Sequence, residues 1–364
     1  MKIVSMNITW VVRATKNNKP KFFPSVRFYG NKTTYADLIS RIIIELDPKN
    51  FLETFGGTGV ISYLLSDFCK TTYIDLLEFC CTWIRALIDK TEISWEKLKE
   101  LAYVAPTHGI ISREFREMYF EENENKWLDG FMIEAWKLRK SERDIAIACI
   151  TQACIAKRPF GAFHRVNLYF RRKKVKRSFN NWITWNKEFK ELYLKFLNEI
   201  RCARKPSNVC VLRDDCFSCE KEADVIYADP PFVGKDHYID YLKLYHFVEG
   251  LARWDEWENL IDRSNKLKCL SRKEYPEFKK INAEEMLKQF FRTSECEAII
   301  FSWSIDGYPD PSWIIKELKK KWDEVCVIGI EKPVYLRGRR LELLFVACSN
   351  AEKVVKDSLK QTKL

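Results

Sequence analysis

The sequence has few histidines, no repeated cysteine pairs and no long apolar run, and each absence excludes a class of protein. With four histidines and a single C-x-x-C pair, Cys216 with Cys219, we expect no bound metal. The 13 cysteines are an odd number without a signal peptide, which excludes a secreted disulfide framework. No stretch approaches the roughly 20 apolar residues of a membrane-spanning helix. We therefore expect a soluble cytoplasmic protein with reduced cysteines and no membrane partner.

Two phosphate-binding motifs are also missing. The chain contains neither G-x-x-x-x-G-K-[ST] nor G-x-G-x-x-G, so it is neither a P-loop protein nor a typical dinucleotide-binding protein. What it does have is 46% hydrophobic residues with charges of both signs over 364 residues. This composition excludes a disordered chain and allows more than one domain.

The excess positive charge is concentrated in one segment. The whole chain has a net charge of +11, and residues 157–205 alone contain 15 Lys or Arg and three Glu. Aromatic residues are interleaved with these charges: Phe160, Phe163, Tyr169, Phe170, Phe179, Trp182 and Trp185. The segment predicts a surface that follows a nucleic-acid backbone and contacts bases. The alternative is a solvated basic face whose aromatic side chains lie in the core.

Strands and helices alternate on both sides of a helical region. We expect strands at 50–54 and 71–74, helices at 60–68 and 76–88, and a glycine-rich turn at 55–59. Helical patterns then dominate from 90 to 204, including 112–120 and 142–157. Strands return at 208, and the last two form an antiparallel pair. The sequence therefore predicts an α/β fold with a mostly parallel, Rossmann-like sheet, a closing antiparallel hairpin and a mainly helical insertion.

The turn E-T-F-G-G-T-G at 53–59 lies between a predicted strand and a predicted helix. Glycines at such a turn let the backbone approach a ligand closely. Asp75 ends the next strand, where nucleoside-binding folds place an acid that accepts hydrogen bonds from ribose. A nucleoside ligand without a phosphate cradle favours S-adenosylmethionine. The alternative is an ordinary tight turn.

The motif A-D-P-P-F at 228–232 follows another predicted strand and is more specific. Consecutive prolines fix the backbone and leave carbonyl groups as acceptors. A planar amino group could donate to the Asp229 carboxylate and the Pro230 carbonyl, with the ring of Phe232 stacked on the base. A rigid turn after a strand is the structural alternative.

These two motifs, in this order, resemble the Dam-related class of N6-adenine DNA methyltransferases, which depend on S-adenosylmethionine. The resemblance covers roughly residues 26–349 and includes R-F-Y-G-N-K near the N-terminus, V-L-R-D-D-C-F at 211–217 and F-S-W-S-I-D-G-Y-P at 301–309. It departs from the class at Thr54, where proline is usual, and at Phe232, where tyrosine is usual. Stacking needs only the aromatic face, so we expect Phe232 to serve.

The resemblance implies roles for individual residues. Cofactor binding is implied for Tyr29, Gly30, Lys32, Glu53, Phe55, Gly57, Gly59, Asp75 and Asp215. A catalytic role is implied for Asp229, Pro230, Pro231 and Phe232. DNA binding is implied for Arg158, His164, Arg165, Asn167, Arg171 and Arg172. Residues 20–89 and 206–349 would form a discontinuous methyltransferase domain, and 90–205 an inserted target-recognition domain.

The implied activity is site-specific methyl transfer to the N6 amino group of adenine in double-stranded DNA, by base flipping and direct transfer. Three alternatives stay open: an N4-cytosine DNA methyltransferase, an RNA adenine methyltransferase, and a DNA-binding protein without catalysis. Carbon-5 cytosine methylation is disfavoured because its nucleophile is a cysteine after proline, and no proline here is followed by cysteine. A restriction-modification role with a cognate endonuclease is a further question that the resemblance raises.

Overall fold

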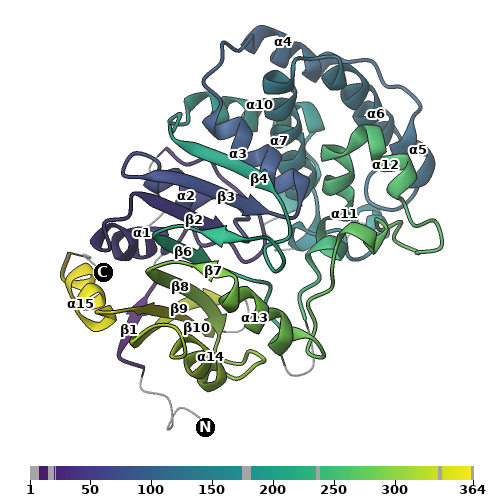
Figure 1. Cartoon of the computed structure of the whole chain (residues 1–364). Helices are drawn as coiled ribbons and strands as arrows, with labels where there is room; N and C mark the ends of the chain where they lie inside the picture. The colour runs from purple at the N-terminus through teal and green to yellow at the C-terminus, as the bar shows by residue number, and fades with distance from the viewer. Residues whose placement is uncertain are drawn as a thin grey trace.

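An eight-stranded sheet forms the centre of the computed structural model, which describes residues 8–14, 20, 22–173, 182–234, 238–334 and 338–361. Across the sheet the strands lie in the order β1-β9-β10-β8-β6-β2-β3-β4 (Figure 1). Their bounds are β1 Trp10–Arg13, β2 Asn50–Thr54, β3 Lys70–Asp75, β4 Val209–Arg213, β6 Val225–Ala228, β8 Ala298–Ser304, β9 Glu324–Val334 and β10 Gly338–Cys348. A separate two-stranded sheet pairs β5 (Lys221–Glu222) with β7 (Ser294–Glu295).

Most strand pairs are parallel. β6 is parallel to both β2 and β8, and β3 is parallel to both β2 and β4. β10 instead runs antiparallel to β8 and β9, as the closing hairpin. The predicted fold class, a mostly parallel α/β sheet with a closing antiparallel hairpin, is confirmed, and β1 pairs in parallel with β9 outside that hairpin.

The strand order reverses between β2 and β6. From β2 the chain moves outward through β3 to β4, and from β6 it moves the other way through β8. Thr54 at the end of β2 pairs in register with Ala228 at the end of β6. In open α/β sheets, ligands bind outside the carboxyl ends of the strands at such a reversal. Both predicted motifs, at 55–59 and 229–232, start from these two strand ends.

Helices cover both faces of the sheet. The helices α1 (Ala36–Glu45), α2 (Val60–Leu65) and α15 (Ala351–Gln361) share one apolar core with the sheet, and α13 (Ala283–Arg292) and α14 (Pro311–Leu318) share another. In β8, Ile300 belongs to the first core and Ile299 to the second, so every residue of this strand is buried. A strand covered on both faces reads as a continuous apolar run rather than an alternating one.

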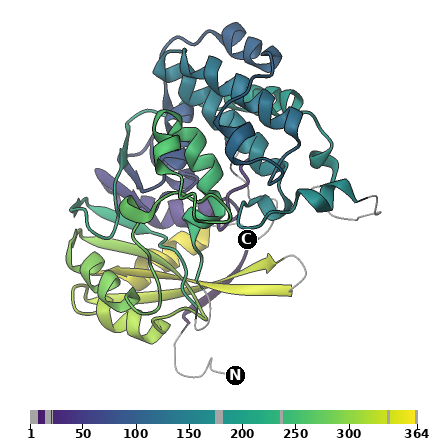
Figure 2. The ribbon, with the colours of Figure 1, turned by 90° about the vertical axis from the view of Figure 1, so that its right-hand side faces the viewer.

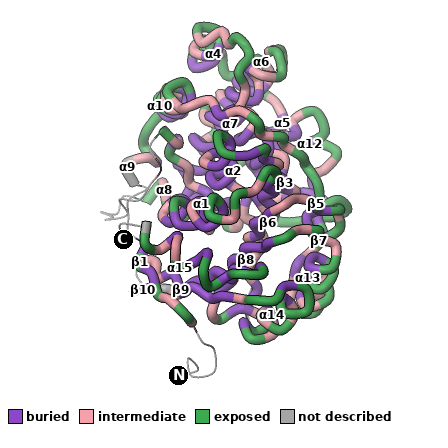
Figure 3. The backbone as a smooth tube through the Cα atoms, turned by 60° about the vertical axis from the view of Figure 1, so that its left-hand side comes forward, coloured by how far each residue is buried: buried purple, intermediate pink, exposed green. Residues whose placement is uncertain are grey.

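Between β3 and β4 in the sequence, the chain forms a layer of helices at one end of the molecule (Figure 1 and Figure 2). It begins with α3 (Glu78–Ile88), followed by α4 (Trp95–Glu100), α5 (Ile110–Glu114), α6 (Glu122–Trp136), α7 (Lys140–Ala156), α8 (Leu168–Arg172), α9 (Trp182–Trp185) and α10 (Phe189–Cys202). Burial extends along almost all of α7, at the centre of this layer (Figure 3). One apolar core joins α3 and α7 to α11 (Tyr241–Ala252) and α12 (Trp254–Leu260), which follow β6. The insertion therefore shares its core with the helices beside the sheet.

One predicted helix is much shorter in the structure. The pattern at 112–120 predicts a helix, but α5 ends at Glu114. Glu117 has a φ of +58°, in the left-handed region, so a right-handed helix cannot continue through it. Within the described residues, no helix combines the length and the apolar character needed to cross a membrane.

A buried glutamate on α11 holds the start of α3. Glu249 is fully buried, and its carboxylate accepts hydrogen bonds at 3.0 Å from the backbone N–H groups of Glu78 and Phe79. It also accepts one from the Tyr275 hydroxyl at 2.8 Å. The first N–H groups of a helix have no partner within the helix, so a carboxylate there satisfies them and favours the helix dipole. Glu249 thereby fixes the helix that follows Asp75.

We predict that Glu249→Ala lowers the free energy of unfolding by about 2–4 kcal/mol, because three buried donors lose their acceptor. Urea unfolding monitored by circular dichroism measures the loss. Glu258→Ala is the matched control, since this exposed glutamate pairs with Arg113 and Arg263 at the surface and should cost less than about 1 kcal/mol. Equal losses in the two variants would contradict the capping role.

Candidate active site

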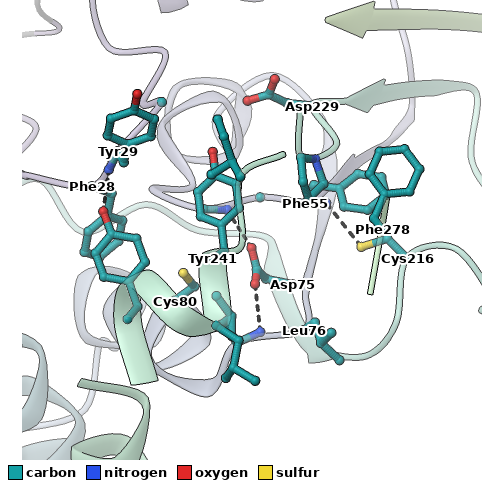
Figure 4. A pocket seen from close by; sticks show the side chains of 18 of the residues that line it. Phe28, Tyr29, Phe55, Asp75, Leu76, Cys80, Cys216, Asp229, Tyr241 and Phe278 are labelled. Carbon is teal, nitrogen blue, oxygen red and sulfur yellow. Dashed lines mark hydrogen bonds between the residues drawn. The ribbon is translucent and has the colours of Figure 1, made fainter. Parts of the chain in front are cut away.

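A pocket lies at the carboxyl ends of β6, β2, β3 and β4, where the two motifs meet (Figure 4). Ten residues expected in the site line it: Tyr29, Gly30, Lys32, Glu53, Phe55, Gly57, Asp75, Asp215, Asp229 and Pro231. Gly59, Pro230, Phe232 and the six residues expected to bind DNA do not line it. The structure thus brings together most of the expected cofactor residues with Asp229 and Pro231 of the expected catalytic motif.

The glycine-rich turn is pressed against β3. The Gly56 N–H donates to the Ile74 carbonyl at 3.0 Å, and the Gly57 N–H donates to Asp75 Oδ2 at 2.8 Å. A Cβ on Gly56 would lie 2.1 Å from the Tyr73 ring, so only glycine fits there. Gly56 lines the pocket but is missing from the predicted site residues, although its place in the turn signals it.

Asp75 is buried at the end of β3 and organises two backbone segments. Besides the bond from Gly57, its Oδ1 accepts the Leu77 N–H at 2.8 Å. Burial raises the pKa of Asp75 to about 6, against the lowering effect of these hydrogen bonds. At neutral pH the side chain is therefore a carboxylate, whose oxygens can accept further hydrogen bonds.

Aromatic rings and Asp215 form the wall beyond β3. The Phe55 N–H donates to Cys216 Sγ at 3.2 Å, and the rings of Phe217 and Phe278 stack with centroids 4.7 Å apart. Asp215 lines the pocket, whereas its exposed neighbour Asp214 does not. Phe278 lies far from these motifs in the sequence, and no local pattern signals its position.

Two tyrosines of α11 fix the N-terminal motif. The Tyr29 N–H donates to the Tyr245 hydroxyl at 2.6 Å. Gly30 has a φ of +78°, and a Cβ there would lie 2.8 Å from the hydroxyl of Tyr241. Both tyrosines line the pocket and were missed by the sequence analysis, because only the fold brings α11 to this edge.

Lys32 is buried and contacts the predicted catalytic acid. Its ammonium group forms a hydrogen-bonded ion pair with Asp229 Oδ2 and lies 3.0 Å from Glu342 Oε1 on β10. Burial lowers the pKa of Lys32, but the charges of Asp229 and Glu342 outweigh it and raise the pKa above its ordinary value. Lys32 therefore stays charged at every physiological pH.

Asp229 keeps one oxygen free. Its Oδ2 is held by Lys32, while its buried Oδ1 has no hydrogen-bond partner among the described residues. Burial raises the pKa of Asp229 to about 6, and Lys32 opposes that rise. Above this pH Oδ1 is an unpartnered carboxylate oxygen of a residue that lines the pocket, and Figure 4 shows the Asp229 side chain at the pocket's edge.

A second buried acid, Glu53, ends β2. Its Oε2 accepts the Ser62 N–H at 2.8 Å, which ties the strand end to α2. Burial is the main cause that raises the pKa of Glu53 to about 8, and the nearby charges of Asp229 and Asp75 add to it. Glu53 is thus largely protonated at neutral pH and can itself donate a hydrogen bond.

The corner at 229–234 is supported by the loop that follows β8. The Tyr308 N–H donates to the Val233 carbonyl at 2.7 Å, and Gly234 forms a β-bridge with Gly307. The half-buried ring of Phe232 meets Trp303 edge to face, with centroids 5.7 Å apart, and Lys32 Nζ lies 5.2 Å from its centroid. These contacts fix the orientation of the ring that we expect to stack on the base.

The residues expected to bind DNA lie in different environments. Arg158 is 1% exposed, and its guanidinium donates to the carbonyls of Ala162, Tyr119 and Arg165 at 3.3, 3.2 and 2.8 Å. Arg165 is exposed. Half-buried His164 and Asn167 have buried side-chain atoms without partners among the described residues, Nδ1 and Oδ1 respectively. Burial lowers the pKa of His164, and nearby basic side chains lower it further. His164 is therefore neutral at physiological pH.

Acidic side chains neutralise part of the basic segment. Arg171 pairs with Glu124, and Arg172 pairs with Glu117 and Glu121. Lys157 is buried and lies 2.8 Å from the same Glu124. The aromatic residues divide as well, since Phe163 and Trp185 are buried while Phe160, Tyr169 and Phe170 are exposed. Phe179 and the side chain of Trp182 lie outside the described residues.

Residues 28–293 match a family described as D12 class N6 adenine-specific DNA methyltransferase. The chain belongs to this family. The expected membership in the Dam-related class is therefore confirmed, and with it the enzyme class and the methyl donor of that class, S-adenosylmethionine. None of the curated proteins compared matches the chain. A crystal structure from Pyrococcus horikoshii, described as a candidate RNA methyltransferase, is similar at 10% identity over 91% of this chain and 90% of its own, with a TM-score of 0.29. Because that score is low, the family membership rests on the sequence match.

The pocket of this methyltransferase fits a long, extended nucleoside ligand. It passes from Asp215 after β4, across the ends of β3 and β2, to Asp229 after β6. Neighbouring strands are about 4.8 Å apart, so the pocket spans roughly 14 Å. Between these two ends it carries the Asp75 carboxylate. An adenosyl group joined to an amino acid has matching length and hydrogen-bonding groups.

The two adjacent aspartates after β4 offer a direct comparison. We predict that Asp215→Ala weakens the binding of S-adenosylmethionine at least about tenfold, because Asp215 lines the pocket and can accept a hydrogen bond from the ligand. Asp214→Ala, the matched control, should change the affinity less than about twofold. Isothermal titration calorimetry measures both constants. The assignment is contradicted if Asp214 proves the more important of the two.

Proposed function

We propose that this enzyme methylates the N6 amino group of adenine in double-stranded DNA, by direct transfer to a base turned out of the helix. The observation that carries this proposal is the unpartnered Oδ1 of Asp229, a buried acceptor at the edge of the pocket. An amino group with two hydrogens needs acceptors held in a fixed direction. Asp229 and Pro230 supply a carboxylate and a backbone carbonyl at the same corner.

The cofactor would be held by side chains and backbone at the ends of β2, β3 and β4. Asp75 would accept hydrogen bonds from the ribose hydroxyls, since it is ionised at neutral pH. Asp215 would accept one from the adenine amino group of the cofactor, and Gly57 would let the backbone approach it closely. When bound, S-adenosylmethionine supplies an electrophilic methyl group on its sulfonium.

The target base is paired and stacked inside a duplex, so it must leave the helix, at a cost of a few kcal/mol. Phe232 would stack on the extruded adenine, which returns roughly 1–3 kcal/mol. Asp229 Oδ1 and the Pro230 carbonyl would accept the two amino hydrogens and orient the nitrogen for attack. Holding the reacting nitrogen in line with its target supplies much of the remaining rate increase.

The helical insertion at 90–205 is our proposed target-recognition domain. Gly161 is close to the N-terminal motif, since a Cβ there would lie 3.4 Å from the Arg27 carbonyl, and the Phe163 N–H donates to the Leu244 carbonyl of α11 at 2.8 Å. The segment that contains Arg165 therefore runs next to elements that line the pocket. Arg165, Tyr169 and Phe170 are exposed, and in this proposal they would contact DNA while Asp229 holds a base.

The other possible substrates differ in the product they would give. N4-cytosine methylation would yield a modified cytosine, and an RNA enzyme would prefer RNA to duplex DNA. A DNA-binding protein without catalysis would yield no modified base. A partner endonuclease and a role in restriction-modification stay predictions.

The function is tested by incubating the purified enzyme with labelled S-adenosylmethionine and duplex DNA, digesting the DNA and identifying the methylated nucleoside. We predict N6-methyladenine, and loss of at least about a hundredfold of this activity in Asp229→Ala. Cofactor affinity, measured separately, should change less than about threefold.

Asp306→Ala is the matched control, because Asp306 is an exposed aspartate in the loop that supports the same corner. It should keep activity within about threefold of the wild type. Label in cytosine, label only in RNA, or full activity of Asp229→Ala would contradict the proposal.

Arg165 and Arg158 should respond differently to substitution. We predict that Arg165→Ala weakens DNA binding without lowering stability. In a plot of the logarithm of the binding constant against the logarithm of the salt concentration, the slope should become shallower by about one. Arg158→Ala should instead lower the free energy of unfolding by at least about 2 kcal/mol, because three carbonyls lose a buried donor. Fluorescence anisotropy across a salt series and urea unfolding measure the two effects. The same stability loss in both variants would contradict this division.

A further inference from the structure

Behind Asp229 lies a chain of buried and half-buried charges that alternate in sign. Asp229 pairs with Lys32, Lys32 with Glu342, and Glu342 with Lys332. The four side chains come from four places in the fold. Asp229 directly follows β6, Lys32 lies in the loop before α1, Glu342 lies on β10 and Lys332 lies on β9. Their exposed fractions are 18%, 7%, 2% and 22% in the same order. We name this set the charge chain.

Lys32 is held between three oxygen atoms. Its ammonium group donates hydrogen bonds to Asp229 Oδ2 and, at 3.2 Å, to the Gly30 carbonyl, and it forms an ion pair with Glu342 Oε1 at 3.0 Å. The charge of Glu342 and the Gly30 carbonyl therefore oppose a movement of the ammonium toward the second oxygen of Asp229. In this arrangement Lys32 stays on Oδ2, and Oδ1 has no partner among the described residues.

We propose that Glu342 and Lys332 are positioning residues for methyl transfer, with Glu342 holding Lys32 on one oxygen of Asp229 and Lys332 balancing the charge of Glu342. Neither residue lines the pocket, so both act through Lys32. The inference rests on the proposed function, in which Asp229 accepts hydrogen bonds from the target amino group. In this proposal the hairpin of β9 and β10 supports methyl transfer, because Glu342 and Lys332 lie on its two strands.

The two residues affect Asp229 with opposite signs. The negative charge of Glu342 raises the pKa of Asp229, and the positive charge of Lys332 lowers it, around the value of about 6 that burial mainly sets. Removing the charge of Glu342 should therefore let Asp229 ionise at lower pH. Removing that of Lys332 should delay ionisation to higher pH. A residue that merely supports the fold would not produce opposite shifts.

Four other titratable groups near Asp229 have a pKa higher than that of Asp229. They are Tyr35 before α1, Glu53 on β2, Tyr227 on β6 and Tyr241 on α11. Burial raises the pKa of the three tyrosines well above the ordinary value, so they stay neutral, and it raises that of Glu53 to about 8. Asp75, whose pKa burial raises to about 6, titrates in the same range and has to be separated from Asp229 by experiment.

The test is a direct titration of Asp229 in the protein without cofactor. Carboxyl ¹³C-labelled aspartate is followed by NMR from about pH 4 to about pH 8, and the Asp229 signal is assigned as the one that Asp229→Asn removes. We expect Glu342→Gln to move the midpoint down by about one pH unit and Lys332→Gln to move it up by about one. Glu324→Gln at the other end of β9 and Lys353→Gln on α15 remove the same charges elsewhere and should leave the midpoint unchanged.

Activity gives a second readout. At saturating cofactor, the acidic limb of the kcat profile should shift in the same direction as the titration in each variant. Unchanged midpoints, or shifts of the same sign in both variants, would overturn the inference. Should Glu342→Gln fail to fold, the more exposed Lys332→Gln still decides it. If the shifts occur but the wild type methylates no polynucleotide, the proposed function fails and the charge chain stands.

Discussion

The ion pair between buried Lys32 and half-buried Asp229 joins two segments of the proposed active site. It connects the N-terminal motif, which lines the pocket through Tyr29 and Gly30, to the corner after β6. Without Asp229, Lys32 would be a buried cation paired only with Glu342, and without Lys32, no cation would lie between the carboxylates of Asp229 and Glu342. Removing one member of a buried pair costs far more than the pair contributes. The ion pair thus explains why one oxygen of Asp229 is fixed while the other stays available.

The sequence predicted the parts of the site that local patterns encode. The strands at 50–54 and 71–74 agree with β2 and β3, since both are short segments that contain β-branched and aromatic residues and end at turns. Gly57, Asp75 and Asp229 lie where strands end, so their convergence follows from a parallel sheet. The helix predicted at 142–157 agrees closely with α7, Lys140–Ala156, because this long segment is rich in apolar residues and contains no glycine or proline that would end a helix.

Long-range partners could not be predicted. Lys32 and Glu342 are separated by most of the chain, and nothing near either residue shows that they meet. The same holds for Tyr241 and Tyr245, which reach the pocket only because α11 packs beside α3. Arg158 illustrates a different limit, since a run of arginines looks the same whether its members face solvent or bind buried carbonyls.

Net charge proved a poor guide to exposed charge. The basic segment 157–205 carries all of the excess positive charge, yet acidic side chains on and before α6 pair with Arg171, Arg172 and Lys157. A smaller set of side chains stays exposed, including Arg165 and the aromatic Tyr169 and Phe170, and these are the ones that would contact DNA in the proposed function. We expect DNA binding by such a surface to depend less on the total charge of the segment and more on the positions where aromatic rings can stack on bases.

The central claim is that Asp229 receives the target adenine. A crystal structure of the enzyme with a non-reactive cofactor analogue and duplex DNA containing its site measures this directly. The account predicts the adenine outside the helix, with its amino nitrogen about 3 Å from Asp229 Oδ1 and from the Pro230 carbonyl. An adenine that stays stacked, or one that lies against another wall while Asp229 Oδ1 faces only protein, would contradict it.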